Sequence, residues 1–416
     1  MRDWSFALVL AVGLLAASCE KRSQPVDGSG ASGGTTSGSG SVQNPAAPDT
    51  RAPGSASGGS GTAEADTILI GEVGSLTGSE ATFGISTRDG VELAVKEANE
   101  AGGIKGRKIV VRVYDDQGKP EEAANAVTRL ISQDHAKMII GEVASSNSLA
   151  MAPKCQSGQV PMITPSSTNP KVTAVGDYIF RVCFIDPFQG FVMAKFAKEN
   201  LKFTRAAVLK DVKSAYSLGL TDVFTRKFTE MGGKIVGTES YSKGDSDFRA
   251  QLTAIKSQKP EAIYVPGYYT DVGIIARQAR EIGIKAPMLG GDGWDSEKLF
   301  ELGGSAIVGS YFSNHYSPDD PSPRVKKFLA TYKAAYGVIP DSLAALGYDA
   351  ARVAIDAMKR APDLTGPALR QAVAQTKDFP GVAGTITLDE NRNPVKPAVV
   401  LQVENGKTKY IATITP

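Results

Sequence analysis

The chain has few of the residue types that many enzymes use as catalytic groups or metal ligands. Its 416 residues include 2 histidines, 3 cysteines and 2 tryptophans. Neither histidine has the spacing of a metal ligand, and Ser145 has no local base signature. No G-x-x-x-x-G-K-[ST] sequence is present, and no G-x-G-x-x-G follows a strand and opens a helix. We therefore expect neither enzyme activity nor a cofactor or metal, and we interpret His135 and His315 as solvated residues beside strands.

An excess of one charge is also absent. Lys and Arg number 46 and Asp and Glu number 44, which gives a formal net charge of +2. No basic run of five or more residues occurs, so neither nucleic acid nor a membrane surface is an expected electrostatic partner. With 42% hydrophobic and 22% charged residues, the composition is that of a globular protein with more than one domain. Binding partners must therefore be inferred from individual binding sites and not from the overall charge.

No apolar run is long enough to span a bilayer. The longest, from Phe6 to Ala17, follows Arg2 and ends in small residues before Cys19, which is typical of an export signal. The sequence LLAASC resembles a bacterial lipobox, which would put a lipid on Cys19 and anchor the exported protein to the cell membrane. Simple secretion with a free Cys19 is the alternative. Residues 20–65 are rich in Gly, Ser and Pro and predict a disordered tether.

From Asp66 onward, short apolar strands alternate with helical patterns. Near-continuous Val, Ile and Leu strands separated by helices indicate parallel sheets covered on both faces. The alternation restarts at Arg205, which predicts an α/β fold with two doubly wound lobes and a ligand cleft between them. The expected helices include those near 147–158, 216–232, 247–257 and 270–283, and the strands include TILIGEV, KIVVRVYDD, KMIIGEV, VPMIT, RAAVLKD, KIVGTESY, AIYVPG and PMLGG.

The loops that follow these strands differ between the lobes. In the first lobe they are rich in hydroxyls, as in GSLTG, ASSN and ITPSSTNP. Hydroxyls and helix N-terminal amides suit an anionic group. In the second lobe the loops carry Tyr216, Tyr268, Asp292 and Trp294, and aromatic rings with one carboxylate suit a cation. The cleft is thus expected to hold a ligand with one group of each charge.

Several motifs carry a family resemblance in matching order and spacing. They are GSLTG, GGIKGRKI, DDQGKPEEA, ASSNSLAMAP, VPMITPSSTNP, FRVCFIDPFQG, GYYTDVG and GYDAA. From Ile68 to the C-terminus the chain resembles the extracellular solute receptors of branched-chain amino acid ABC transporters, which are type I periplasmic binding proteins. The resemblance implies two lobes joined by a three-stranded hinge that closes on the ligand. It places the N-terminal lobe at 67–187 and 316–377, and the C-terminal lobe at 188–315 and 378–416.

The resemblance also assigns a ligand-binding site. It implies that Ser145 and Thr168 bind the carboxylate of the ligand, that Ser166 offers a backbone carbonyl to the ammonium, and that Tyr216 and Tyr268 close over the ligand. The short polar stretch after VPMIT would then form half of an amino-acid clamp, with Asn169 and Pro170 shaping the following turn.

Two positions depart from the family pattern. Asp292 falls where the family has a glutamate that pairs with the ligand ammonium, and Leu343 falls where the branched-chain receptor has a tyrosine. Phe83 and Trp294 are expected to line the side-chain pocket. Glu72 and Glu142, which end strands near the cleft, are interpreted as solvated carboxylates at the sheet edge.

These assignments predict an extracytoplasmic receptor, monomeric and not an enzyme. It would bind a free amino acid, aliphatic or branched-chain, and deliver it to an ABC permease. A lipid-tethered sensor of the same fold, acting in signalling, is the alternative, and no feature of the sequence separates the two.

Two cysteines remain after Cys19. In an exported protein, Cys155 and Cys183 could form a disulfide or stay as two buried free thiols. Cys155 falls on a predicted helix and Cys183 at the end of a predicted strand. Because disulfide geometry is restrictive, both alternatives stay open.

Overall fold

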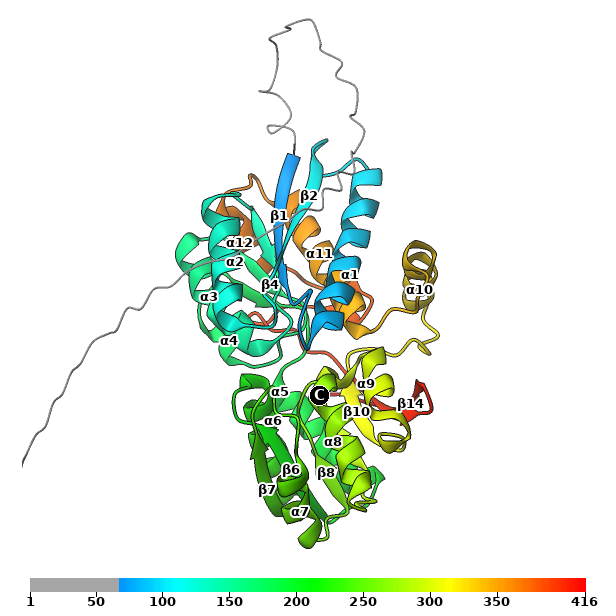
Figure 1. Cartoon of the computed structure of the whole chain (residues 1–416). Helices are drawn as coiled ribbons and strands as arrows, with labels where there is room; N and C mark the ends of the chain where they lie inside the picture. Colours follow the sequence, from blue (N-terminus) through cyan, green and yellow to red (C-terminus); the bar gives the residue numbers. More distant parts are fainter. Residues whose placement is uncertain (1–66) are drawn as a thin grey trace, which may run out of the picture. The chain divides into compact units, whose positions relative to one another are not determined.

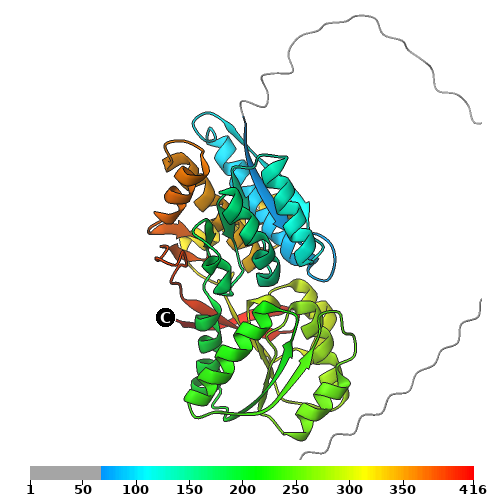
Figure 2. The ribbon, with the colours of Figure 1, turned by 90° about the vertical axis from the view of Figure 1, so that its left-hand side faces the viewer.

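The computed structural model describes residues 67–416. The predicted export signal with Cys19, and the predicted tether over 20–65, lie outside the described residues. The described chain is an α/β fold with two large sheets, as the strand and helix pattern predicts (Figure 1). Figures 1 and 2 show the N-terminal strand, in blue, in one sheet and the C-terminal strands, in red, in the other.

The first sheet has five parallel strands in the order β2-β1-β3-β4-β5. Side chains alternate along β1, so Ile68 and Ile70 face one core while Leu69 and Val73 face the other. Helices cover both faces, which explains the near-continuous apolar strands. The strands are β1 (Thr67–Gly74), β2 (Lys108–Asp115), β3 (Met138–Ile140), β4 (Met162–Thr164) and β5 (Ile179–Arg181). One face packs on α1 (Ala81–Glu100), α10 (Pro323–Tyr336), α11 (Ser342–Arg360) and α12 (Gly366–Ala374), and the other on α2 (Pro120–Ser132), α3 (Ser145–Gly158) and α4 (Lys171–Ala174).

Helices α1 and α11 touch backbone to backbone at two glycines. A Cβ on Gly90 would lie 2.1 Å from the carbonyl oxygen of Ala344, and one on Gly347 would lie 2.4 Å from that of Thr87. Only glycine permits such an approach. The close crossing fixes the start of α11, with Leu343, beside the start of α1, with Phe83.

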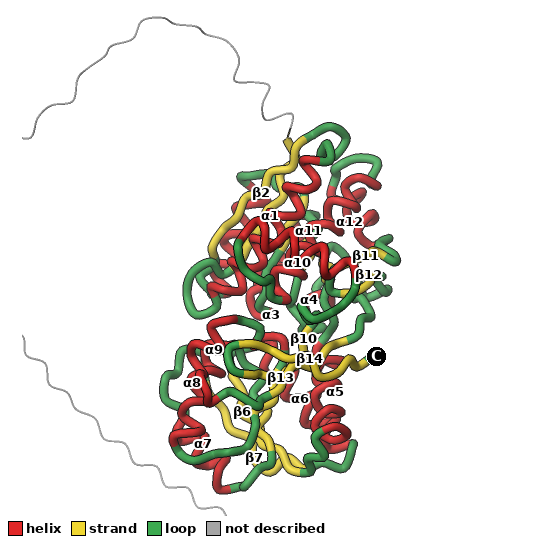
Figure 3. The backbone as a smooth tube through the Cα atoms, turned by 90° about the vertical axis from the view of Figure 1, so that its right-hand side faces the viewer, coloured by secondary structure: helices red, strands yellow, loops and turns green. Residues whose placement is uncertain are grey.

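The second sheet has seven strands in the order β14-β13-β10-β9-β8-β6-β7. Strands β6 to β10 pair in parallel, and β13 and β14 add two antiparallel strands at one edge. Figure 3 shows α7, α8 and α9 on one side of this sheet and α5 and α6 on the other, in agreement with its two cores. The strands are β6 (Arg205–Asp211), β7 (Lys234–Tyr241), β8 (Ala262–Tyr264), β9 (Met288–Gly290), β10 (Tyr311–Asn314), β13 (Ala398–Glu404) and β14 (Lys407–Ile414). The helices are α5 (Asp186–Lys195), η1 (Phe196–Asn200), α6 (Ala215–Glu230), α7 (Arg249–Ser257), α8 (Tyr269–Glu281), η2 (Asp292–Trp294), α9 (Glu297–Gly303) and η3 (Gly304–Ala306).

The chain crosses between the two sheets three times, at 182–185, 315–322 and 387–397. These crossovers form the three-stranded hinge that the family resemblance implies. The first and third are tied together, because Lys396 Nζ donates a hydrogen bond to the Val182 carbonyl at 3.0 Å. The lobe boundaries assigned from the sequence stay a prediction. They place the hairpin of β11 (Phe379–Gly381) and β12 (Gly384–Ile386) in the second lobe, whereas Val382 and Ile386 pack in the core of the first sheet.

The two described cysteines are free thiols, so the disulfide alternative is not formed. Cys155 packs in the core on the α2 and α3 face of the first sheet, and Cys183 packs in the core on its other face. The Cys183 thiol donates to the Ser167 carbonyl at 3.4 Å. Within residues 67–416, no helix combines the length and apolar character needed to cross a bilayer.

Candidate ligand-binding site

A small cavity lies where loops from the carboxyl ends of the two sheets meet. Its free volume is about 10 Å³, the space of roughly one water molecule, and both lobes contribute to its wall. From the first lobe come one side chain of α1, one of α11 and the loops after β3 and β4. The second lobe contributes the starts of α6 and α8 and the turn η2. The lining residues are Phe83, Val143, Ser166, Tyr216, Tyr268, Asp292, Gly293 and Leu343. Five of the residues predicted from the sequence therefore meet in one place.

The wall from the first lobe presents a buried hydroxyl. Ser166 Oγ and the nearby Thr168 Oγ1 are both buried, and neither has a hydrogen-bond partner within the described residues. A buried polar group without a partner costs about 1–3 kcal/mol, so a ligand atom that bonds to it gains that energy. The Ser166 hydroxyl is thus available to form a hydrogen bond with a ligand in the cavity.

The turn that carries Ser166 is fixed from behind. The guanidinium of the fully buried Arg181 donates to the carbonyls of Ser167 and Asn169, the latter at 2.8 Å. Ser167 Oγ donates in addition to the carbonyl of Glu142 at 2.9 Å. The polar stretch ITPSSTNP is therefore a turn that Arg181 and Glu142 hold by hydrogen bonds, and Ser166 of this turn lines the cavity.

The wall from the second lobe is aromatic. Tyr216 and Tyr268 are stacked, with ring centroids 5.2 Å apart and an angle of 11° between the planes. Phe83, from the first lobe, meets the edge of Tyr268 at 5.7 Å and of Tyr269 at 4.9 Å. Such faces attract a cation, and their edges pack against apolar groups.

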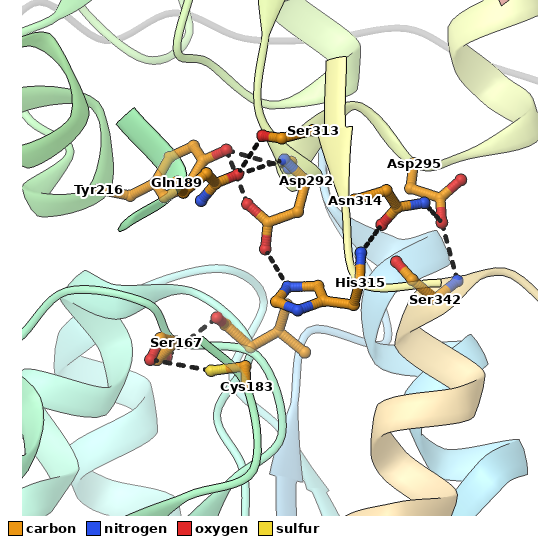
Figure 4. A network of polar contacts seen from close by, with 12 residues as sticks. Ser167, Cys183, Gln189, Tyr216, Asp292, Asp295, Ser313, Asn314, His315 and Ser342 are labelled. Atoms are coloured by element: carbon orange, nitrogen blue, oxygen red, sulfur yellow. Dashed lines mark hydrogen bonds and ion pairs between the residues drawn. The ribbon is translucent and has the colours of Figure 1, made fainter. Parts of the chain in front are cut away.

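Asp292 supplies the negative charge of the cavity, and two donors orient it (Figure 4). Tyr216 Oη donates to Asp292 Oδ1 at 2.9 Å, and His315 Nε2 lies 2.8 Å from Oδ2. Burial, with Asp292 close by, raises the pKa of Tyr216 well above its usual value, so the phenol keeps its proton. The Asp292 amide donates to Gln189 Oε1 at 2.8 Å, which fixes the backbone as well. The carboxylate is thus an oriented partner for a cationic group.

The prediction for His315 was wrong. Its side chain is fully buried beside Asp292 instead of being solvated, because the crossover after β10 carries it between the lobes. His135, by contrast, is exposed as predicted.

Several contacts join the lobes outside the cavity. Lys243 Nζ, after β7, lies 2.7 Å from Glu80 Oε1 and donates to the Gly118 carbonyl at 2.9 Å. At the starts of α3 and α6, Ser146 Oγ accepts from the Ala215 amide at 3.1 Å. Asp295 Oδ2 accepts from the Ser342 amide at 2.7 Å, and thus joins the turn after η2 to the start of α11 (Figure 4). The two walls of the cavity are therefore held in direct contact.

Comparison with known proteins agrees with this architecture. A family model described as periplasmic binding protein matches residues 67–408. The chain belongs to the periplasmic binding proteins. Among curated relatives, a Leu/Ile/Val-binding protein homolog from Brucella melitensis is 32% identical over 343 residues, which cover 82% of this chain and 92% of that protein.

Solved structures of periplasmic binding proteins superpose on most of the chain. A leucine binding protein from Thermotoga maritima is 41% identical with a TM-score of 0.80, and the match covers 84% of this chain and 99% of the other. A branched-chain amino acid transporter substrate binding protein from Streptococcus pneumoniae, in complex with isoleucine, is 34% identical with a TM-score of 0.80, covering 84% and 100%. Since these relatives are binding proteins and not enzymes, this chain is a solute-binding protein of an extracytoplasmic family.

Three predicted ligand contacts of this periplasmic binding protein do not line the cavity. Ser145 begins α3, and its Oγ accepts from the Asn169 amide at 3.3 Å. Thr168 lies in the same turn as Ser166 but outside the lining. The Trp294 indole is fully buried over Gly290 and donates to the Val265 carbonyl at 3.0 Å, so it packs in the second lobe. Ligand contacts by these three residues stay predictions.

The two strand-end glutamates are buried, which corrects their assignment as solvated. Glu142 accepts from the Ala144 amide and, at 3.2 Å, from Ser75 Oγ. Its pKa is raised well above the usual value, first by burial and then by Asp116. The Glu72 carboxyl has no partner among the described residues, and burial raises its pKa to about 8. Both are internal groups of the first lobe.

Sequence reasoning did not assign Val143, Gly293, Gln189 or His315 to the site. Val143 ends the expected strand KMIIGEV and Gly293 lies two residues after the expected strand PMLGG, and both are residue types that are common at strand ends and in loops. Gln189 lies on α5, away from any strand end, and His315 follows β10, a strand that was not named among those expected. One signal was available for His315, since a histidine directly after a buried strand with a hinge crossover next to it is placed near the cleft.

Proposed function

We propose that this protein binds one free aliphatic L-α-amino acid, of the leucine, isoleucine or valine type, between its lobes and delivers it to an ABC permease. The observation that carries the proposal is the lining of the cavity to which both lobes contribute. It combines an oriented carboxylate, a buried hydroxyl without a partner and an apolar patch.

The polar groups of the cavity match the two ends of an amino acid. Asp292 and the faces of Tyr216 and Tyr268 suit the ammonium group. The Ser166 hydroxyl, which has no partner within the described residues, suits the carboxylate as a donor, in addition to the contact of its backbone carbonyl with the ammonium that the family resemblance implies. A sugar or nucleoside would leave Asp292 without a countercharge in a closed cavity, which is unfavourable.

The apolar part of the lining suits a branched aliphatic side chain. Phe83, Val143 and Leu343 supply it, and the walls must move apart to admit a solute, because the free volume is about 10 Å³. The Leu/Ile/Val-binding names of the relatives support the same ligand class.

Ligand identity can be tested directly. Mass spectrometry of the solute released by denaturing freshly purified protein should detect leucine, isoleucine or valine. Calorimetry of ligand-free protein should then show saturable binding of these amino acids and much weaker binding of 4-methylpentanoate, which lacks the ammonium group. Retention of another metabolite, with no response to the three amino acids, would contradict the proposal.

Delivery to a permease and attachment to the membrane extend the proposal. The relatives support transport, since one is named as a transporter substrate binding protein. We propose that a lipid on Cys19 anchors the mature protein and that residues 20–65 tether the lobes to it. Cys19→Ser should move the protein from the membrane fraction to the soluble fraction without changing leucine affinity.

A further inference from the structure

His315 occupies a position that ordinary packing does not require. It directly follows β10 and begins the second crossover of the hinge. Its imidazole is fully buried and stacks on Phe184, with ring centroids 3.8 Å apart and an angle of 23° between the planes. Its backbone amide donates to Asn314 Oδ1 at 2.9 Å. The ring is therefore held in place from the hinge side, with Nε2 directed at the ligand cavity's carboxylate (Figure 4).

We propose that His315 is a positioning residue, which as a neutral donor holds Asp292 for the cationic group of the ligand and which, on taking up a proton, competes with that group. This inference rests on the proposed function, since it assumes that the cationic group is the ammonium of an amino acid.

The geometry defines the tautomer. Asp292 Oδ2 is an acceptor 2.8 Å from Nε2, so Nε2 carries the hydrogen. Nδ1 is buried and has no partner within residues 67–416. In the neutral ring Nδ1 is a bare lone pair, and a second proton would enter there. That proton would make the imidazolium a cation in contact with Asp292, where the ligand ammonium is expected.

Burial and the surrounding charges determine the pKa of the His315 ring. Burial lowers the pKa of His315 from its usual value, and Lys396, from the segment before β13, acts in the same direction. Asp292 of η2 and Asp295 after it act in the opposite direction. The stacked Phe184 carries no charge. The carboxyl group of Asp186 on α5 is also buried, and burial, together with the charge of Asp292, raises its pKa to about 8.

The sign of the pH effect follows from these positions. A ligand ammonium beside Asp292 repels a protonated His315, so ligand binding must lower the pKa of His315 further. By linkage, protonation of His315 must then weaken ligand binding. The effect of His315 on affinity should be absent above its pKa in the free protein, and affinity should fall as pH drops through that pKa. The limiting slope is about tenfold per pH unit.

The two histidines of the chain permit a matched test. Calorimetry with L-leucine from pH 4.5 to 8 would compare the unchanged full-length protein with His315→Gln and His135→Gln. Glutamine keeps a neutral donor near the position of Nε2 but does not titrate in this range. Whatever its affinity at pH 7.5, we expect His315→Gln to lose less affinity than the unchanged protein as pH falls from 7.5 to 4.5. His135→Gln, which changes the exposed histidine, should follow the unchanged protein throughout.

A second measurement covers the case in which His315→Gln does not fold. Nuclear magnetic resonance of the unchanged protein with labelled histidine rings gives two ring signals per state to titrate. Adding L-leucine should lower the midpoint of one of them, the buried His315, and leave His135 unmoved. The proposal is overturned if leucine shifts neither midpoint, if it shifts that of His135, or if His315→Gln keeps the acid weakening of the unchanged protein.

A different experimental result would show that the proposed function itself is wrong. If the unchanged protein binds none of leucine, isoleucine and valine at pH 7.5, the proposed function fails and this inference fails with it. Binding of leucine with no dependence on pH above 4.5 overturns only the role of His315.

Discussion

Asp292 lines the cavity and also accepts hydrogen bonds from both Tyr216 and His315. Because both donors hold its oxygens, the carboxylate cannot swing away when the ligand leaves. Such preorganisation lowers the cost of binding. It also means that the charge, and not only the shape, of this residue matters for affinity.

Asp292→Asn should therefore weaken leucine binding by about 2–5 kcal/mol, because the ligand cation would be buried without a countercharge. The same variant should change the weak binding of 4-methylpentanoate much less, since that analogue has no ammonium group. Calorimetry with both ligands gives the comparison. Equal losses for the two would show that Asp292 supports the fold of the cavity and does not contact the cation.

Leu343 is the residue at which the side-chain preference of the cavity should be adjustable. It begins α11, is buried and lines the cavity opposite the second lobe. Leu343→Ala should weaken leucine binding by about 1–3 kcal/mol through lost apolar contact, while phenylalanine, with a larger side chain, should gain relative to leucine. Competition binding measures the ratio. An unchanged ratio would place the ligand side chain elsewhere.

At the scale of elements, the start of α1 is joined to the loop after β7 by the ion pair of Glu80 and Lys243. Glu80 is buried, with 3% of its side chain exposed, whereas 32% of the Lys243 side chain is exposed. Removing the lysine leaves a buried carboxylate alone, and removing the charge of Glu80 leaves a lysine that can reach water. The two variants should therefore differ although they break the same pair.

We expect Lys243→Met to weaken leucine affinity more than Glu80→Gln, with losses of about threefold to thirtyfold for the lysine change. Lys227→Met, which breaks an ion pair within α6 at 2.8 Å, serves as the matched control and should leave affinity unchanged. If all three variants bind leucine equally well, the pair does not contribute to the closed arrangement of the lobes.

Helices and strands were the predictable part of the fold, since they follow from local patterns. The helix expected at 147–158 is α3 (Ser145–Gly158), and the one expected at 270–283 is α8 (Tyr269–Glu281). Their apolar faces repeat at helical spacing, so a single segment carries the signal. The hairpin of β11 and β12 has no such period. Its assignment to the second lobe follows from the family resemblance and stays a prediction, although Val382 and Ile386 pack in the core of the first sheet.

Contacts in the site were less predictable for a physical reason. The rule that ligands bind at the carboxyl ends of strands reaches Ser166, Tyr216, Tyr268 and Asp292. It gives no sign that Asp292 meets His315, because that contact depends on how β9 and the hinge lie in three dimensions. The burial of Glu72 and Glu142 has the same origin, since a charged residue at the end of a strand usually reaches water.

At the scale of the whole molecule, the buried Glu72 should make folding stability depend on pH. Its pKa of about 8 in the folded protein lies above the ordinary 4.5, so the folded state keeps a proton that the unfolded state loses. Below about pH 4.5 the carboxyl is protonated in both the folded and the unfolded state, so its burial does not lower the free energy of unfolding. As pH rises from there toward 8, the free energy of unfolding falls. Burial of the carboxyl is thus a liability at neutral and alkaline pH.

Glu72→Gln should remove that liability. Its melting temperature should match that of the unchanged protein near pH 4.5 and exceed it at pH 8, with a gain of order 2–4 kcal/mol in free energy of unfolding. Glu100→Gln, at an exposed position of the same helix-covered lobe, should show no pH-dependent difference. Thermal unfolding followed by circular dichroism at the two pH values checks both. A gain at pH 4.5 equal to that at pH 8 would point to packing instead of proton linkage.

The position of Trp294 determines what intrinsic fluorescence can report. It is the only tryptophan after Trp4, and its indole lies in the core of the second lobe, bonded to Val265 and outside the cavity lining. Its emission should resemble that of an indole in hydrocarbon surroundings, and it records the melting of the second lobe alone, because the core of the first sheet contains no tryptophan. Circular dichroism averages both lobes. A denaturation curve followed by the two signals therefore separates the lobes without labels, and any divergence between the curves measures how independently each half of this receptor unfolds.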